Sequence, residues 1–181
     1  SYNNYNDIFT GLEILSSFKK NGTVIIKHAN PSGASMNISP LKSFEESFNC
    51  DPISAFGGVV LCNFKINKMI AKKISSIFFE IIVAKGFDKD ALKIFGTKKN
   101  PILLKISRFK NNFAQQIKYF DNSFLIQDKN NKIMDRKKLT FVTKLKPTKN
   151  ELKYAEFAYN ICKYVKSNSI VISNRFSTIG I

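Results

Sequence analysis

The chain has 181 residues, 44% of them hydrophobic, and its 29 Lys and Arg against 13 Asp and Glu give a formal net charge of +16 at pH 7. This length suits one domain or slightly more, and without an apolar run of roughly 18 residues or a targeting signal we expect a cytoplasmic protein with no membrane partner. The basic residues are dispersed in short groups, at 71–73, 97–99 and 135–138, and match no finger, RRM or KH pattern, so no specific nucleic-acid partner is expected.

The first hundred residues alternate helices and strands. Hydrophobic residues at helical spacing and polar caps predict the helices, and short β-branched runs predict buried strands. In chain order, we expect a helix capped by Asp7 and ended by Gly22, a strand at 23–27, a break at "ANPSG" (29–33), a helix opened by Ser39 and Pro40, a strand at 57–64, a helix after Asn67, a strand at 80–84 and a short helix at 88–95.

The second half contains the most clearly marked helix. Thr148 and Glu151 have the T-x-x-E spacing of a capping box, and the helix that they begin is expected to run to about Ser167. The polar stretch 129–138 is a predicted surface loop. Strands are expected at 101–107, 123–128, 139–143, 169–173 and 177–181. This alternation of helices and strands predicts a layered α/β fold.

The three cysteines are far apart and form no metal-binding pattern. Cys50, Cys62 and Cys162 include no CxxC, and the chain has a single histidine. Scattered residues of this kind lack the ligand spacing of a zinc site. We expect buried apolar thiols in a reducing compartment and no bound metal.

The single histidine, His28, follows Lys27 at the end of a predicted strand. An imidazole with an ordinary pKa near 6.5 can accept and return a proton near neutral pH, and the neighbouring ammonium can hold an anionic oxygen. A hydrogen-bonded loop histidine gives the same local pattern, so the residues alone leave catalysis and a structural role both open.

Two further stretches also have two interpretations. "DPISAFGGVV" (51–60) fits an ordinary loop with Phe56 in the core, or an aromatic wall and bare backbone at Gly57 that line a ligand pocket. In "KYVKSNSIVIS" (163–173), Asn168 fits a left-handed helix C-cap, or a carboxamide that points from a helix end into a site.

Together these stretches resemble one family. "SYNN", "VIIKHANPSGAS", "DPISAFGGVV", "LIQD", "KYVKSNSIVIS" and "TIGI" occur in the order found in the bifunctional AICAR transformylase/IMP cyclohydrolase family of purine (IMP) biosynthesis. The resemblance extends from residue 1 to residue 181, and KHANPSG followed by DPISAFGG is highly specific for it. The chain is similar to the first part of the transformylase domain.

The resemblance implies a cytoplasmic, folate-dependent formyltransferase, within a multifunctional enzyme that also has a hydrolase activity. It would transfer a formyl group from its co-substrate 10-formyltetrahydrofolate to the 5-amino group of AICAR. In the family the Lys-His pair is catalytic, which implies that His28 accepts a proton and that Lys27 is the cation near the developing charge. Asn168 would complete the catalytic set by orienting the AICAR carboxamide and the Lys-His pair.

The substrate-binding residues also follow from the resemblance. Phe56 and Gly57 match a family loop that lies beside the ligands, and Glu80 falls where the family has an acidic residue near the folate and AICAR. The implied partners are therefore AICAR and reduced folate. No metal is implied, and the complete protein is expected to be a homodimer.

The family's fold is two tandem cytidine-deaminase-like lobes without the deaminase zinc. This implies that residues 1–145 form the first lobe and that 146–181 are the incomplete beginning of the second. The cyclohydrolase domain is absent from the chain, so we expect a truncated α/β transformylase domain that is inactive as an isolated 181-residue chain. A non-catalytic remnant or a basic binding module is the alternative.

Overall fold

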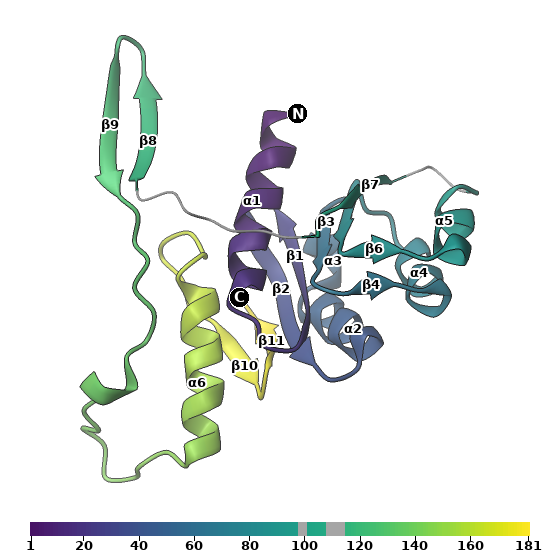
Figure 1. Cartoon of the computed structure of the whole chain (residues 1–181). Coiled ribbons are helices and arrows are strands. Elements are labelled where there is room, and N and C mark those ends of the chain that lie inside the picture. The colour runs from purple at the N-terminus through teal and green to yellow at the C-terminus, as the bar shows by residue number, and fades with distance from the viewer. Residues whose placement is uncertain (98–100, 108–114) are drawn as a thin grey trace.

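Figure 1 shows a computed structural model of the chain, which describes residues 1–97, 101–107 and 115–181. The helices are α1 (Tyr2–Ser16), α2 (Pro40–Cys50), α3 (Pro52–Ala55), α4 (Lys68–Ser75), α5 (Lys89–Phe95), the 3-10 turn η1 (Arg136–Lys138) and α6 (Lys149–Cys162). The strands are β1 (Asn21–Lys27), β2 (Asn30–Asn37), β3 (Val59–Cys62), β4 (Lys65–Ile66), β5 (Ile81–Ala84), β6 (Gly86–Phe87), β7 (Ile102–Lys105), β8 (Gln115–Phe120), β9 (Ser123–Asp128), β10 (Ile172–Asn174) and β11 (Ser177–Gly180). Within these residues, no helix combines the length and the apolar character that a membrane span requires.

Seven strands form one mixed sheet in the order β10-β11-β2-β1-β3-β5-β7. The central strand β1 is antiparallel to both β2 and β3, whereas β3, β5 and β7 run parallel. The parallel strands are joined through α4 and α5, because a parallel pair needs a long crossover connection. β3 and β5 read as continuous apolar runs since helices cover both of their faces.

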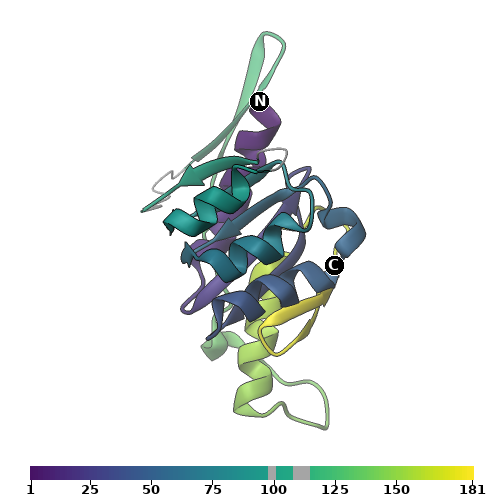
Figure 2. The same ribbon diagram turned by 90° about the vertical axis from the view of Figure 1, so that its right-hand side faces the viewer.

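The sheet separates two hydrophobic cores, because successive side chains of a strand point to opposite faces. One core lies between the sheet and α2, α4 and α5, and includes Ile25, Phe44 and Ile82; these helices stand in front of the sheet in Figure 2. The other lies between the sheet and α1 and α6, and includes Ile26 and Phe157. The predicted layered α/β fold is confirmed.

The C-terminal strand β11 lies against β2 and joins the two ends of the chain. The Thr178 hydroxyl accepts a hydrogen bond from the Ala34 N–H at 2.9 Å and donates one to the Ala34 carbonyl at 3.2 Å. Both residues are buried and stand 144 positions apart in the sequence. Residues near the C-terminus therefore complete the sheet that the N-terminal third begins.

β8 and β9 form a separate hairpin that extends away from the main sheet (Figure 1). Its ladder pairs Ile117 with Ile126 and Tyr119 with Phe124, and all four side chains are at least half exposed. The predicted surface loop at 129–138 follows it; most of its residues are exposed, and it includes η1.

Most of the predicted helix caps are confirmed. Ser39 caps α2 and Asn67 caps α4, each accepting a hydrogen bond from the N–H three residues further on. Thr148 and Glu151 form the reciprocal capping box that the sequence predicts for α6. The expected strands at 23–27, 80–84, 101–107 and 123–128 correspond to β1, β5, β7 and β9.

The prediction for the first helix is wrong at both ends. α1 begins at Tyr2 with Ser1 as its N-cap, and it ends at Ser16 instead of Gly22. Asp7 lies inside the helix and is buried, and its carboxylate accepts a hydrogen bond from the Ala29 N–H. An aspartate that a local pattern assigns to a cap is therefore used for a tertiary contact.

Four other predictions are also corrected. The break expected at 29–33 is shorter than predicted, because the turn comprises only His28 and Ala29, and β2 begins at Asn30 and includes the Pro and Gly that suggested the break. Residues 139–143 form no strand: within the described residues no strand pairs with them, and Val142 is 91% exposed. α6 ends at Cys162 instead of near Ser167, and the strand expected at 169–173 starts only at Ile172.

Gly33 tests the packing of β2 against α2. A Cβ at this position would lie 1.9 Å from the carbonyl oxygen of Ser47, whose backbone belongs to α2. Gly33→Ala should therefore lower the free energy of unfolding by about 3 kcal/mol, since the helix must move. The matched control is Gly86→Ala, whose Cβ would make an ordinary 3.7 Å contact with Lys65. Urea unfolding that gives equal losses for the two variants would contradict this account of Gly33.

Candidate functional site

His28 lies in the two-residue turn that joins β1 to β2. Lys27 and Asn30 pair across this turn, and both His28 and Ala29 have a φ of 56°. Positive φ at both central positions is the pattern of a type I′ turn, which Asn and Gly normally occupy. For other residues the left-handed conformation costs roughly 1–2 kcal/mol each. The turn therefore presents an exposed imidazole on a strained backbone.

Side chains from two distant elements hold this turn. The Asp7 carboxylate of α1 accepts a hydrogen bond from the Ala29 N–H at 2.5 Å. The Lys166 ammonium, from the segment after α6, donates to the His28 carbonyl at 2.6 Å, and the Lys166 N–H donates to Asn30 Oδ1 at 3.0 Å. These contacts compensate the strain with hydrogen bonds to charged groups, which are stronger than neutral ones.

Lys27 connects the turn to the loop around Phe56. Its Nζ donates a hydrogen bond of 2.7 Å to the Phe56 carbonyl. Gly57 follows with a φ of +73°, where any side chain would be strained, and its N–H donates to the Phe78 carbonyl at 2.9 Å. Because an ammonium has three donors, Lys27 can bind a further acceptor while it keeps this contact.

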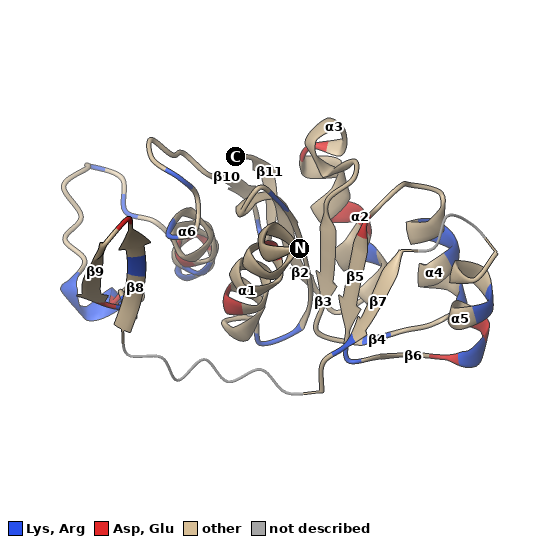
Figure 3. Ribbon diagram, turned by 90° about the horizontal axis from the view of Figure 1, so that it is seen from above, with Lys and Arg blue, Asp and Glu red and all other residues tan. Residues whose placement is uncertain are grey.

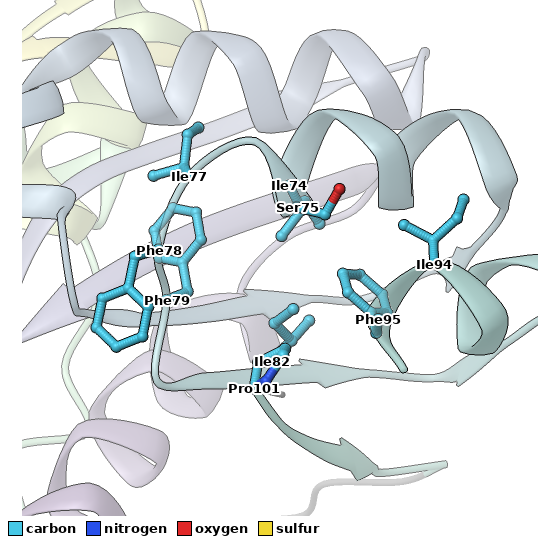
Figure 4. A pocket seen from close by; sticks show the side chains of 9 residues that line it. All are labelled: Ile74, Ser75, Ile77, Phe78, Phe79, Ile82, Ile94, Phe95 and Pro101. Atoms are coloured by element: carbon cyan, nitrogen blue, oxygen red, sulfur yellow. The ribbon is translucent and has the colours of Figure 1, made fainter. Parts of the chain in front are cut away.

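The Phe56 ring lies at the surface instead of in the core. It is 57% exposed, and it contacts the ring of Phe78, itself 43% exposed, with 5.4 Å between the centroids. Phe78 also borders a small cavity of about 30 Å³ (Figure 4), and among the described residues that line it Ser75 is the one polar residue. That cavity has room for little more than one water, and its described lining contains no charged side chain, so it is a poor candidate site.

The remaining predicted residues, Glu80 and Asn168, lie near this region without lining the same cavity. Glu80 precedes β5; its N–H donates to the Gly58 carbonyl and its side chain is exposed. Asn168 is exposed and stands two positions after Lys166. Of the six predicted site residues, the structure brings together Lys27 and His28, with Phe56 and Gly57 beside them.

An open cavity of about 460 Å³ adjoins the turn. It is lined by Lys27, His28, Asn30, Pro31, Ser32, Asp51, Ser54, Lys166 and Ile181. Hydrogen bonds from the Ser54 hydroxyl and N–H hold the pKa of the Asp51 carboxyl below its ordinary value, so Asp51 is ionised near neutral pH. With two lysines against this one carboxylate, the lining favours an anionic ligand.

A second open hollow, of about 480 Å³, lies between α2 and the β10–β11 hairpin. Its lining includes Lys20, Glu46 and Arg175, and none of the predicted site residues. The Glu46 carboxylate already accepts hydrogen bonds from the Ser35 hydroxyl and the Asn37 amide. The cavity at the Lys-His turn is therefore the better candidate, since it combines an imidazole with two ammonium groups, each of which keeps donors beyond its one hydrogen bond within the chain.

The cysteines are all free thiols. Cys62 is buried, and burial raises its pKa to about 12. Cys50 and Cys162 are only half-buried, so the prediction of buried thiols holds for one of the three. In the part of the chain that the structure describes, no group of three or more His, Cys, Asp or Glu side chains could hold a metal ion.

Sequence reasoning missed Asp7 and Lys166 as parts of the site. Asp7 carried the signal of a helix cap, and Lys166 was one of many dispersed lysines. The sequence did contain a signal for Asp7. The residue lies beside Ile8 on the apolar side of α1, and an aspartate is almost never fully buried there unless another group pairs with it. Lys166 had no comparable signal.

The chain matches the sequence model described as the AICARFT/IMPCHase bienzyme over residues 1–181. It is similar to proteins named bifunctional purine biosynthesis protein PurH from three organisms. These are Caldicellulosiruptor saccharolyticus (36% identical over 182 residues, 35% of that protein), Bacillus cereus strain AH187 (34% over 182, 36%) and Prochlorococcus marinus strain MIT 9515 (40% over 193, 37%).

Each of these alignments covers 100% of this chain, which in turn spans little more than a third of the length of the curated relatives it matches. The match to the sequence model and these alignments cover the same residues. The chain therefore belongs to the AICARFT/IMPCHase bienzyme family.

Proposed function

We propose that this chain carries part of the active site of an AICAR formyltransferase of purine biosynthesis. The observation that carries the proposal is that Lys27 and His28 line one open, positively charged cavity, in a chain whose family name includes this activity. The proposed co-substrate is 10-formyltetrahydrofolate. Both it and AICAR are anionic, which suits two lysines beside the histidine.

The chemistry explains why a base and a cation are needed together. The 5-amino group of AICAR is a poor nucleophile, because its lone pair is delocalised into the ring and the carboxamide. As its nitrogen attacks the formyl carbon, His28 would accept the proton that the nitrogen loses. The electron pair of the formyl C=O moves onto oxygen, and the Lys27 ammonium would stabilise that oxyanion. When the C=O re-forms, the bond from the formyl carbon to N10 breaks, and N10 leaves as tetrahydrofolate with the proton that His28 returns.

The other predicted residues have binding roles in this proposal. Phe56 presents an exposed ring and Gly57 a backbone that approaches without a side chain, so both suit a flat heterocycle beside the Lys27 ammonium. Asn168 would orient the AICAR carboxamide, and Glu80 would lie near the folate. Neither residue lines the cavity. We propose that ligands bound at the cavity contact Asn168 and Glu80 in the complete homodimer.

We also retain the lobe assignment as a proposal: residues 1–145 as a first cytidine-deaminase-like lobe, and 146–181 as the start of a second. The zinc of the deaminases would be absent, with no metal cofactor in its place. In the structure α6 and β11 continue the core and the sheet of the preceding residues. The two parts therefore pack as one layered unit.

The central test is the removal of the imidazole from the full-length gene product. We expect His28→Asn to lower the rate of formyl transfer by about 10²–10⁴-fold, the usual cost of losing a general base. Asparagine is preferred to alanine because it adopts the left-handed conformation readily. AICAR binding, measured by calorimetry, should change little. Asp121→Asn, in the β8–β9 turn at a φ of 47°, is the control. A His28→Asn rate within about threefold of wild type would exclude His28 from the chemistry.

The distribution of charge gives a second test. Lys and Arg lie on elements at both ends of the molecule, from α4 and α5 to β8 and η1 (Figure 3), without one continuous stripe; the basic group at 97–99 lies largely outside the described residues. We expect weak binding of DNA and RNA without sequence preference, at about 10⁻⁴–10⁻⁶ M near physiological salt. Salt titrations that reveal a tight, sequence-selective complex would favour a basic binding module instead.

A further inference from the structure

The turn that carries His28 is held from both sides by charged side chains, neither of which transfers a proton or stabilises the oxyanion in the proposed chemistry. Asp7 accepts the Ala29 N–H at 2.5 Å, and Lys166 donates to the His28 carbonyl at 2.6 Å. We propose that Asp7 and Lys166 are positioning residues, a clamp that fixes the direction of the His28 imidazole. This inference rests on the proposed function, because the direction of the imidazole matters to catalysis only if His28 accepts the proton.

The backbone at the turn explains why a clamp is needed. His28 and Ala29 both have a φ of 56°, and neither residue type favours that region. Strained backbone persists only where the surroundings over-determine it, and such residues cluster at active sites. If the turn relaxed, the imidazole would point elsewhere, and a misplacement of about 1 Å can cost 10²-fold in rate.

Asp7 is suited to this role by its position. It lies inside α1, is only 9% exposed, and uses its carboxylate outside its own helix. A buried carboxylate without a partner would be costly, so the contact with Ala29 ties α1 to the turn. Because α1 packs on the sheet, this contact holds Ala29, the residue after His28, at a fixed position relative to the sheet.

Lys166 fixes the other side and connects a second predicted residue. Its ammonium holds the His28 carbonyl and its N–H donates to Asn30 Oδ1 at 3.0 Å, so two hydrogen bonds cross between segments 136 to 138 positions apart. Asn168 stands two residues further on. The same contacts that fix the turn therefore also fix the backbone that presents Asn168.

The first experiment compares Asp7→Ala with Asp7→Asn in the full-length gene product. We expect Asp7→Ala to lower kcat about 10²-fold, because the turn relaxes, while KM for AICAR changes less than about threefold. Asp7→Asn keeps an oxygen acceptor for the Ala29 N–H and should restore most of kcat. A merely structural role would not produce this split between kcat and KM together with rescue by the amide.

The matched control is Asp88→Ala. Asp88 also accepts a hydrogen bond from an alanine N–H, that of Ala91 at 2.7 Å, but it caps α5 far from the turn. Its loss should cost similar stability while kcat stays within about twofold of wild type. If Asp7→Ala and Asp88→Ala lower kcat equally, or if Asp7→Ala leaves kcat unchanged, the clamp is refuted.

The second arm uses Lys166, which is exposed, so its substitution leaves the core intact. Lys166→Met should lower kcat by about tenfold or more, with Lys166→Arg as the rescue and Lys163→Met as the control. Lys166 also lines the cavity, so it could instead bind substrate directly. A Lys166→Met variant with a raised KM for AICAR and an unchanged kcat would show that role and overturn the positioning role of Lys166.

A readout that needs no reaction separates this inference from the proposed function. His28 is the only histidine of the 181 residues, so its imidazole NMR signals in this chain are unambiguous. We expect Asp7→Ala to shift them and to speed the exchange of the Ala29 amide proton, with neither change in Asp88→Ala. Unchanged signals would refute the clamp, whereas a full-length protein without formyl transfer would refute the function alone.

Discussion

The hydrogen bond between the Asp7 carboxylate and the Ala29 N–H is the constraint around which the site is organised. It joins α1, whose other face packs on the sheet, to a turn with two left-handed residues. Without such an anchor, a type I′ turn of His and Ala would be disfavoured against a longer, more relaxed connection. The tight turn also fixes Lys27 at the last position of β1, and from this position its ammonium donates a hydrogen bond to the Phe56 carbonyl.

Much of the fold can be predicted from interactions between residues close in sequence, whereas the site can be predicted from such interactions only in part. The capping box at Thr148, the Ser39 cap and the apolar runs of β3 and β5 were predictable because each depends on neighbours within a few residues. A break after Lys27 was predictable too, but its two-residue length was not, because Pro31 and Gly33 signal a longer break in any isolated segment. Here both lie in β2, where Gly33 lets α2 approach and Pro31 pairs with Ile26.

Partners distant in sequence account for the rest. The apolar stretch 139–143 has strand propensity but no strand beside it, so it stays irregular. Lys27 and His28 were identified by resemblance, since their spacing suits a structural loop equally well. Asp7 and Lys166 belong to the site through contacts 22 and 138 residues away, and although the pattern of α1 signals that Asp7 is buried, no local pattern identifies the partner of either residue. Asn168 and Glu80 keep the roles that family membership suggests, as proposals.

The pairing of β11 with β2 has a consequence for how the protein is made. Thr178 and Ala34 stand 144 positions apart, and Lys166 and His28 stand 138 apart. At about 5–20 residues per second, a ribosome needs roughly 7–30 seconds to cross the interval of 144 residues. During this time the N-terminal hairpin is out of the exit tunnel with one sheet edge and one side of its turn unsatisfied. The order of synthesis therefore makes the centre of the sheet an early event and the completed His28 turn a late one.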